Sequence, residues 1–265
     1  MTATLRATKG GDARVFNFLP AVDRVPLGGA PLQQVIAQVK FNTQSALATH
    51  QGAGVLYDAL SDQYQRMLAE QQAMITAGPG GVTTQQVPQW RLTDLEGVWS
   101  VIAGPEVMAI ETVAYASWEA LRERLRQALD ALDVAAGPRV RERIGLRYVN
   151  HIAAGEDGSF AGRIRPELLG LAGEPGWREA LSASLSQTVL RDGDTQMALR
   201  YGAGAQVVPG NVFVLDIDCS DEQPVEFDAD DVLAYFDTLN DAAYRCFCNC
   251  VPAPYRATLV DQGAP

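Results

Sequence analysis

The chain has 265 residues, of which 47% are hydrophobic and 20% are charged, a composition typical of one or two folded domains. Its 21 basic and 32 acidic residues give a formal net charge of −11, which disfavours nucleic acid and anionic membranes as partners of a broad surface. No apolar run approaches the roughly 20 residues of a membrane span, and the N-terminus lacks the apolar core of a signal peptide. We therefore expect a cytoplasmic protein without a membrane partner.

The first third of the chain predicts a leader, a strand and a helix. Residues 1–14 are small and polar without periodicity, so we expect a mobile leader. Apolar and polar residues alternate over Pro31–Phe41, which predicts a strand. Apolar residues at helical spacing predict a helix over Val55–Ile75.

The middle of the chain predicts a series of strands followed by a helix. Strands are expected over Gln85–Thr93, Val98–Ala103 and Val107–Tyr115. A helix should then begin at the N-cap Ser117 and end near Ala135.

The remainder of the chain again predicts strands followed by a helix. A strand spans Arg139–Ile152, and the Gly- and Pro-rich segment 153–176 marks the expected boundary between domains. Further strands are expected over Leu181–Arg191, Gln196–Tyr201 and Asn211–Cys219, and a final helix over Asp228–Cys250.

This order of elements predicts an α+β fold of antiparallel sheets with long helices packed on one face. Each half consists of strands followed by a helix. We therefore expect two related sheet-and-helix halves, residues 15–155 and 156–265, packed as one globular unit.

Asp216 and Asp218 are candidates for an acidic site, because they flank Ile217 on a strand and so project from one face. Together with Glu111 they could hold a metal ion or act as acid and base. The alternative is that they form salt bridges with arginines of a neighbouring strand, namely Arg147 or Arg200.

The strand over Arg139–Ile152 carries further polar candidates. Its alternation places Tyr148 and Asn150 toward a core, where they can form hydrogen bonds. Arg147 and His151 then lie on the opposite face, where they could meet the acidic pair or bind an anion.

A second interpretation of this strand is a groove of arginines. Arg141, Arg143 and Arg147 could together bind an anion such as a nucleotide, in spite of the acidic balance of the whole chain.

Three of the four cysteines, Cys246, Cys248 and Cys250, are crowded near the C-terminus. Helical phase puts Cys246 and Cys250 on the buried stripe of the last helix, so we expect small core residues there. A metal site would need a second pair of ligands, and only Cys219 and two distant histidines remain. We therefore expect no metal and no cofactor, and a role of the three cysteines beyond packing stays open.

The sequence lacks the motifs of common hydrolases and nucleotide-binding proteins. His50 and His151 are its only histidines, and neither accompanies a Gly-x-Ser-x-Gly nucleophile elbow. A phosphate-binding Gly-x-x-x-x-Gly-Lys-Ser/Thr loop is also missing.

Four segments carry a resemblance to a known family: Pro26–Phe41, Ile110–Trp118, Ile144–Asn150 and Asn211–Asp218. They resemble an uncharacterised, sporadically distributed family of bacterial proteins of about this length, and Leu-Arg-Tyr-Val-Asn is the most specific element. The resemblance covers nearly the whole chain and implies a common fold without an activity. Patchy distribution is typical of genes in mobile elements or defence cassettes, so the resemblance implies a partner subunit in such a cassette. The cysteine cluster is not a feature of the family.

Two functions follow as hypotheses. The first is a non-catalytic binding or assembly protein whose complex is formed with a protein partner or as a homo-oligomer. The alternative is a metal-dependent enzyme that acts on an anionic substrate through Asp216 and Asp218.

Overall fold

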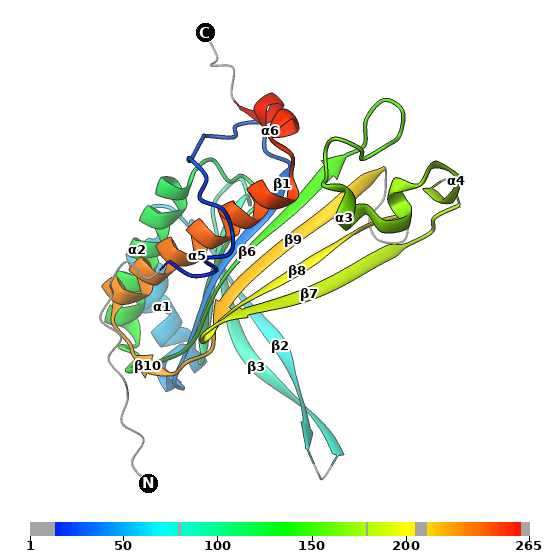
Figure 1. The fold of residues 1–265 in the computed structure, drawn as a ribbon. Coiled ribbons are helices and arrows are strands. Elements are labelled where there is room, and N and C mark those ends of the chain that lie inside the picture. The colour runs from blue at the N-terminus through cyan, green and yellow to red at the C-terminus, as the bar shows by residue number, and fades with distance from the viewer. Residues whose placement is uncertain (1–13, 79–80, 179, 205–210, 261–265) are drawn as a thin grey trace.

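The computed structural model describes residues 14–78, 81–178, 180–204 and 211–260 (Figure 1). Nearly all of the leader expected over residues 1–14 lies outside these ranges. Within them the chain forms helices and an antiparallel sheet, which confirms an α+β fold. The strands are β1 (Leu32–Phe41), β2 (Arg66–Gly78), β3 (Gly81–Thr93), β4 (Trp99–Gly104), β5 (Val107–Thr112), β6 (Val140–Ala153), β7 (Ser184–Asp192), β8 (Thr195–Ala203), β9 (Val212–Asp221) and β10 (Val225–Glu226). The helices are α1 (His50–Leu60), α2 (Trp118–Ala135), α3 (Pro166–Leu169), α4 (Pro175–Arg178), α5 (Ala229–Cys250) and α6 (Ala253–Leu259), with 3₁₀ turns η1 (Ser45–Ala48) and η2 (Gly170–Gly173).

The strands form one sheet in the order β2-β3-β4-β5-β1-β6-β9-β8-β7, and the short β10 pairs with β6. At the centre, β1 and β6 are antiparallel, with Ile36 opposite Arg147. On its other side β6 pairs with β9. Strands from both sides of the composition break at 153–176 therefore belong to the same sheet.

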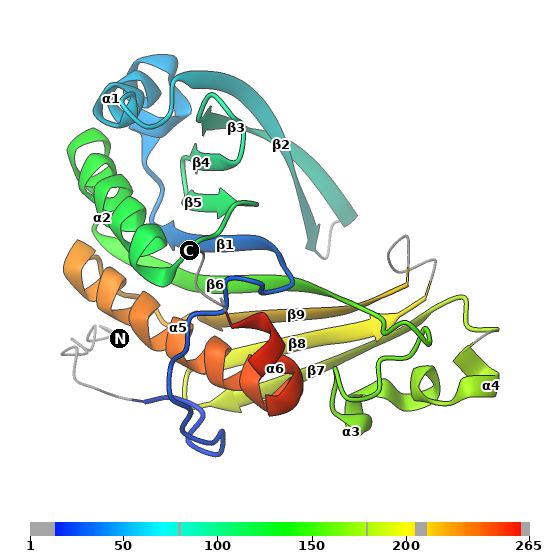
Figure 2. The same cartoon turned by 90° about the horizontal axis from the view of Figure 1, so that it is seen from above.

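The three long helices α1, α2 and α5 lie side by side over one face of the sheet (Figures 1 and 2). Each long helix begins at a side-chain cap; in α2, the Ser117 hydroxyl accepts from the backbone N–H of Ala120 at 3.2 Å. The buried stripe of α2 contains Leu121, Leu125, Leu129 and Leu132. Because amphipathic helices bury one stripe, these side chains fill the core between helix and sheet.

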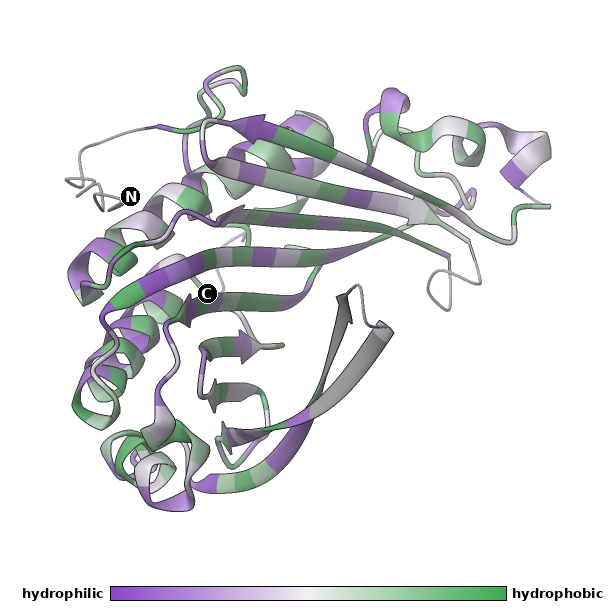
Figure 3. Cartoon of the chain, turned by 90° about the horizontal axis from the view of Figure 1, so that it is seen from below, coloured by the Kyte–Doolittle hydropathy of each residue, from purple (hydrophilic) through white to green (hydrophobic). Residues whose placement is uncertain are grey.

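The opposite face of the sheet is called the open face below, because it carries none of the described helices. Along the strands, hydrophilic and hydrophobic residues alternate, as the alternating colours in Figure 3 show. On β9, for example, Phe213, Leu215 and Ile217 are buried toward the helices. The residues between them project from the open face.

The helix expected over Val55–Ile75 is wrong in its second half. α1 starts earlier, at the N-cap Thr49, and ends at Leu60. Arg66–Gly78 is instead β2, which pairs along its whole length with β3. The apolar spacing of this segment is compatible with both a helix and a strand, and the long-range pairing with β3 stabilises the strand.

Beyond the sheet, β2 and β3 continue as a two-stranded ribbon. They pair from Arg66 opposite Thr93 to Gly78 opposite Gly81, but only Trp90–Thr93 of β3 pairs with β4. Figure 1 shows this ribbon projecting from the body of the protein.

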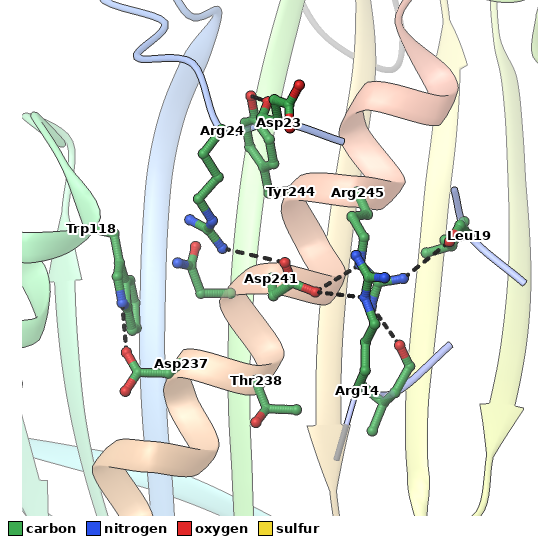
Figure 4. Close-up of polar contacts among 12 residues, drawn as sticks. Arg14, Leu19, Asp23, Arg24, Trp118, Asp237, Thr238, Asp241, Tyr244 and Arg245 are labelled. Atoms are coloured by element: carbon green, nitrogen blue, oxygen red, sulfur yellow. Dashed lines mark hydrogen bonds and ion pairs between the residues drawn. The ribbon is translucent and has the colours of Figure 1, made fainter. Parts of the chain in front are cut away.

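The segment that precedes β1 is fixed to α5 by a buried arginine (Figure 4). Arg245, 1% exposed, donates to the carbonyl oxygens of Val15 (2.6 Å), Phe16 (3.0 Å) and Leu19 (3.3 Å). Its Nε lies 2.7 Å from an oxygen of Asp241. These contacts hold the buried Phe16 at a φ of 54°, a conformation that is costly for a residue with a side chain.

In the part of the chain that the structure describes, no helix is long and apolar enough to cross a membrane.

Candidate functional site

All six candidate site residues lie on the open face of the sheet. In the register of the strands, Arg147 is opposite Asp218, Arg200 is opposite Asp216, and His151 is opposite Val214. Glu111 reaches the same face from β5, where it is opposite Ile36 of β1. The alternation expected for β6 thus matches the register, and the residues share one surface.

Asp216 is the centre of an ion-pair cluster on β6, β8 and β9. Arg147 binds it with two parallel hydrogen bonds, Nε to Oδ1 and Nη2 to Oδ2, both 2.8 Å. Arg200 donates from Nη1 to the same Oδ2 at 3.3 Å. The Asp216 side chain is only 5% exposed, so both guanidinium groups replace water around a buried carboxylate. The hydrogen bond with Asp216 raises the pKa of Arg147 above its ordinary value.

Asp218 extends this cluster toward Arg143. Its carboxylate lies 3.7 Å from Arg200 Nη1 and 3.9 Å from Arg143 Nη2. Arg143 also donates to Gln38 Oε1 at 3.0 Å. We call these five residues the arginine–aspartate cluster: Arg143, Arg147, Arg200, Asp216 and Asp218.

Glu111 does not join the acidic pair. It lies 3.3 Å from Arg91 of β3, and Arg91 also binds Glu70 of β2 at 2.8 Å. These three residues lie on the opposite side of the central strand β1 from Asp216 and Asp218. Within the described ranges, no group of three or more His, Cys, Asp or Glu side chains is arranged to hold a metal ion. The acidic site that would combine Glu111 with Asp216 and Asp218 is therefore not assembled.

The arginine groove expected on β6 is divided between the two faces. Arg141 is buried on the helix side, where its guanidinium lies 5.0 Å from the centre of the Tyr235 ring and 3.6 Å from Asp221. A register shift at the end of β1 turns the strand here, as a β-bulge does. Arg141 therefore does not share a surface with Arg143 and Arg147.

The charge of the open face is opposite in sign to that of the whole chain. By register, the nine strands from β1 to β9 place seven basic and four acidic residues on it. The basic residues are Lys40, Arg66, Arg91, Arg143, Arg147, Arg191 and Arg200, and the acidic ones are Glu70, Glu111, Asp216 and Asp218. Glu222, which follows β9, lies 3.7 Å from Arg143 at the edge of this face. The excess of basic residues on the strands favours an acidic group over a basic one at this surface.

The arrangement suits binding better than catalysis by the acidic pair. A divalent cation is held by carboxylate oxygens, and both oxygens of Asp216 already accept hydrogen bonds from arginines. Displacing those arginines would leave their charges to be compensated elsewhere. The cluster instead holds three long arginine side chains in fixed positions on the sheet.

A pocket of about 290 Å³ lies away from the cluster, at the far end of β8 and β9. Its lining is mainly apolar, and includes Phe160, Leu181 and Ala203 together with Arg178 and Asn211. None of the cluster residues lines it.

The four cysteines are buried free thiols. Cys219 faces α5 from β9, and burial raises the pKa of its thiol well above the ordinary range. The hydrogen bond with Cys250 and burial likewise raise the pKa of Cys246. Cys248, which the helical phase does not place on the stripe of Cys246 and Cys250, is buried as well.

These thiols make stability depend on pH. In the unfolded chain a thiol ionises above about pH 8.5, whereas folded Cys219 keeps its proton, so the free energy of unfolding should fall as pH rises from there. In Cys219→Ala, this fall should be less steep by up to about 1.4 kcal/mol per pH unit. Urea unfolding between pH 8 and 10 measures both slopes. Equal slopes would show that Cys219 is not protected in the folded state.

The sequence does not predict the polar contacts of α5. Asp237 accepts a hydrogen bond from the Trp118 ring at 2.7 Å (Figure 4). It accepts another from Arg122 at 2.9 Å, and the two contacts join α2 to α5. Asp241 and Arg245, four residues apart, anchor the N-terminal segment. The only local sign of this anchor in the sequence is the spacing of four residues between Asp241 and Arg245. Because the same spacing is common on exposed helix surfaces, it does not identify a buried anchor.

Tyr148 and Asn150, which were expected to form hydrogen bonds in a core, both do so on the helix side of β6. The amide of Asn240 on α5 joins the Tyr148 hydroxyl at 2.9 Å to the guanidinium of Arg24 at 2.9 Å. Asn150 donates to the carbonyl oxygen of Leu215 at 3.1 Å. Both side chains thus satisfy their polar groups inside the protein.

A scan against protein-family models gives no match to this chain, and a search of curated proteins gives none either.

Proposed function

We propose that the chain is a non-catalytic binding or assembly protein that docks a protein partner on the open face of its sheet. The observation that carries this proposal is the arginine–aspartate cluster. Its two carboxylates, which were the candidates for catalysis, are occupied by arginines on a broad surface free of described helices. Ordered arginines on such a surface are typical anchors of protein interfaces.

The chemistry of the partner follows from charge. The open face carries more basic than acidic residues, and the rest of the chain repels negative charge. We therefore propose an acidic protein surface as the ligand, and neither nucleic acid nor a membrane. The resemblance to a sporadically distributed bacterial family supports a cytoplasmic partner subunit in a mobile-element or defence cassette.

We also propose that the chain contains two related sheet-and-helix halves. In each half a first strand, β1 or β6, lies next to the last strand of the same half, β5 or β9. A long helix then follows in sequence: α2 directly after β5, and α5 after the short β10. In this proposal the halves meet between α2 and β6, earlier than the boundary at residues 155 and 156 expected from composition.

Affinity purification of the tagged protein from its own cells tests the docking surface. Lys40→Glu combined with Arg66→Glu reverses two exposed charges on the open face, while Arg126→Glu reverses one exposed charge on the solvent side of α2. A partner of the open face should bind the wild type and Arg126→Glu equally and the double variant at least about tenfold more weakly, since like charges then meet at the interface. Titration with the purified partner measures these affinities, and equal binding by all three proteins would refute the docking surface.

An enzymatic assay tests the competing metal-dependent mechanism. The purified protein is incubated with nucleotides, phosphate esters and nucleic acids in the presence of Mg²⁺ or Mn²⁺. Our proposal requires that Asp216→Asn leave any measured rate unchanged. Turnover that is lost in Asp216→Asn would establish an enzyme and contradict a purely binding role.

A further inference from the structure

The last strand of the sheet, β7, has a regular inner edge and an open outer edge. It pairs with β8 over nine residues without a bulge, from Ser184 opposite Ala203 to Asp192 opposite Thr195. Among the described residues, no strand pairs with its other side. Figure 2 shows β7 as the outermost strand of the sheet.

The turn that joins β7 to β8 decides which backbone groups point outward. Gly193 and Asp194 form a two-residue loop, and Gly193 has a φ of 58°, as the first position of a type II′ turn requires. Such a loop is closed by a hydrogen-bonded pair, here Asp192 and Thr195. By alternation, Leu185, Gln187, Val189 and Arg191 direct their N–H and C=O groups away from β8. The side chains of these four residues lie on the open face.

Most of this edge lacks the features that protect edges in monomeric proteins. The ten residues from Leu181 to Leu190 contain neither a charge nor a proline, and the charged residues of β7, Arg191 and Asp192, stand only at its turn end. The opposite edge of the sheet is different, because Arg66 and Glu70 stand on the edge strand β2, and Pro88 lies in the neighbouring β3. An unprotected strand of high β-propensity is a template for another strand.

We infer that β7 pairs with β7 of a second copy of this chain in an antiparallel, two-fold symmetric arrangement. In a symmetric pair each outward-facing residue must meet an outward-facing residue. With Gln187 on the axis, Leu185 lies opposite Val189 of the partner subunit, and this contact occurs twice. These two side chains are among the exposed large hydrophobic ones, 66% and 47% exposed, so pairing them removes apolar surface from water.

The other face of the strand fits the same register. There Ser186 lies opposite Thr188 of the partner subunit, so hydroxyl groups meet hydroxyl groups. Placing Thr188 on the axis instead would put Leu185 opposite Arg191 of the partner subunit and lose the apolar contact. A second copy is therefore the partner that this edge matches, and the pairing is independent of what the open face binds.

Measurement of molar mass in solution tests the dimer. Light scattering on the full-length wild type over a concentration series should approach twice the chain mass of 28.5 kDa. Leu185→Lys combined with Val189→Lys brings four lysines together at the pairing edge and should raise the dimer dissociation constant at least about tenfold. Leu68→Lys, at an exposed residue of the opposite edge strand, should leave it unchanged. A wild type that stays monomeric at all concentrations would refute the pairing, as would equal dissociation constants in all three proteins.

A cysteine at the axis tests the register even if the lysine variant does not fold. Directly opposed residues of a hydrogen-bonded pair have Cα atoms about 5.5 Å apart, within the range of a disulfide. Gln187→Cys should therefore form an intermolecular disulfide on mild oxidation, seen as a dimer on non-reducing gels. Thr188→Cys, displaced from the axis, should crosslink much less. Efficient crosslinking of Thr188→Cys alone would overturn the register.

Discussion

Replacing Arg245 with methionine is expected to lower the free energy of unfolding by about 3–5 kcal/mol. The substitution removes the donor of three buried carbonyl oxygens, on Val15, Phe16 and Leu19, and leaves the Asp241 carboxylate without its nearest cation. An unsatisfied buried acceptor retains its desolvation cost, and methionine fills the space without replacing the hydrogen bonds. Urea unfolding followed by circular dichroism measures the loss.

Arg14→Met is the matched control for this prediction. Arg14 also contacts Asp241, but at 3.8 Å and with a side chain 47% exposed, so its loss should cost less than about 1 kcal/mol. Limited proteolysis supplies a second measurement, because in Arg245→Met the segment 14–25 should be cut while the sheet resists. Similar stability losses in both variants would show that Arg245 does not anchor this segment.

A double-mutant cycle on Arg147 and Asp216 is expected to give a coupling energy of about 2–3 kcal/mol. The two side chains form two charge-assisted hydrogen bonds of 2.8 Å around a carboxylate that is 5% exposed. Replacing either residue with alanine should therefore cost much of what replacing both costs. Arg147→Lys should recover only part of the stability, because an ammonium group cannot make the two parallel bonds.

The pair of Arg91 and Glu70 gives the reference value for an ordinary ion pair on the same face. These side chains are 29% and 36% exposed and meet through one contact of 2.8 Å, so their coupling energy should stay below about 1 kcal/mol. If both cycles gave the same value, the arginine–aspartate cluster would be a common surface ion pair and not a rigid part of the open face.

Local signals in the sequence were sufficient for the elements whose structure depends on near neighbours. The caps Ser117 and Asp228 both accept backbone hydrogen bonds at the starts of α2 and α5. The two-residue turn at Gly193-Asp194 joins β7 to β8, two strands that the sequence predicts. The helix predicted over Val55–Ile75 is wrong in its second half, because the apolar spacing there is compatible with both a helix and a strand. Only the pairing with the distant β3 distinguishes the two structures.

The candidate site depended on strand order, which is a long-range property. Alternation along β6 and β9 correctly separated Arg147 and His151 from Tyr148, because side-chain direction follows from period two. It could not show that Glu111 lies next to Arg91, since this requires knowing that β4 separates β3 from β5. The burial of Arg141 follows from a register shift that has no local signature in the sequence.

The contacts of Arg245 also set an order of events during synthesis. The carbonyl of Phe16 leaves the ribosome 229 residues before its donor, Arg245. At ribosomal speeds of about 5–20 residues per second, the segment waits roughly 10–45 s before the helix that binds it exists. The first described residues of the chain are therefore among the last to reach their native place.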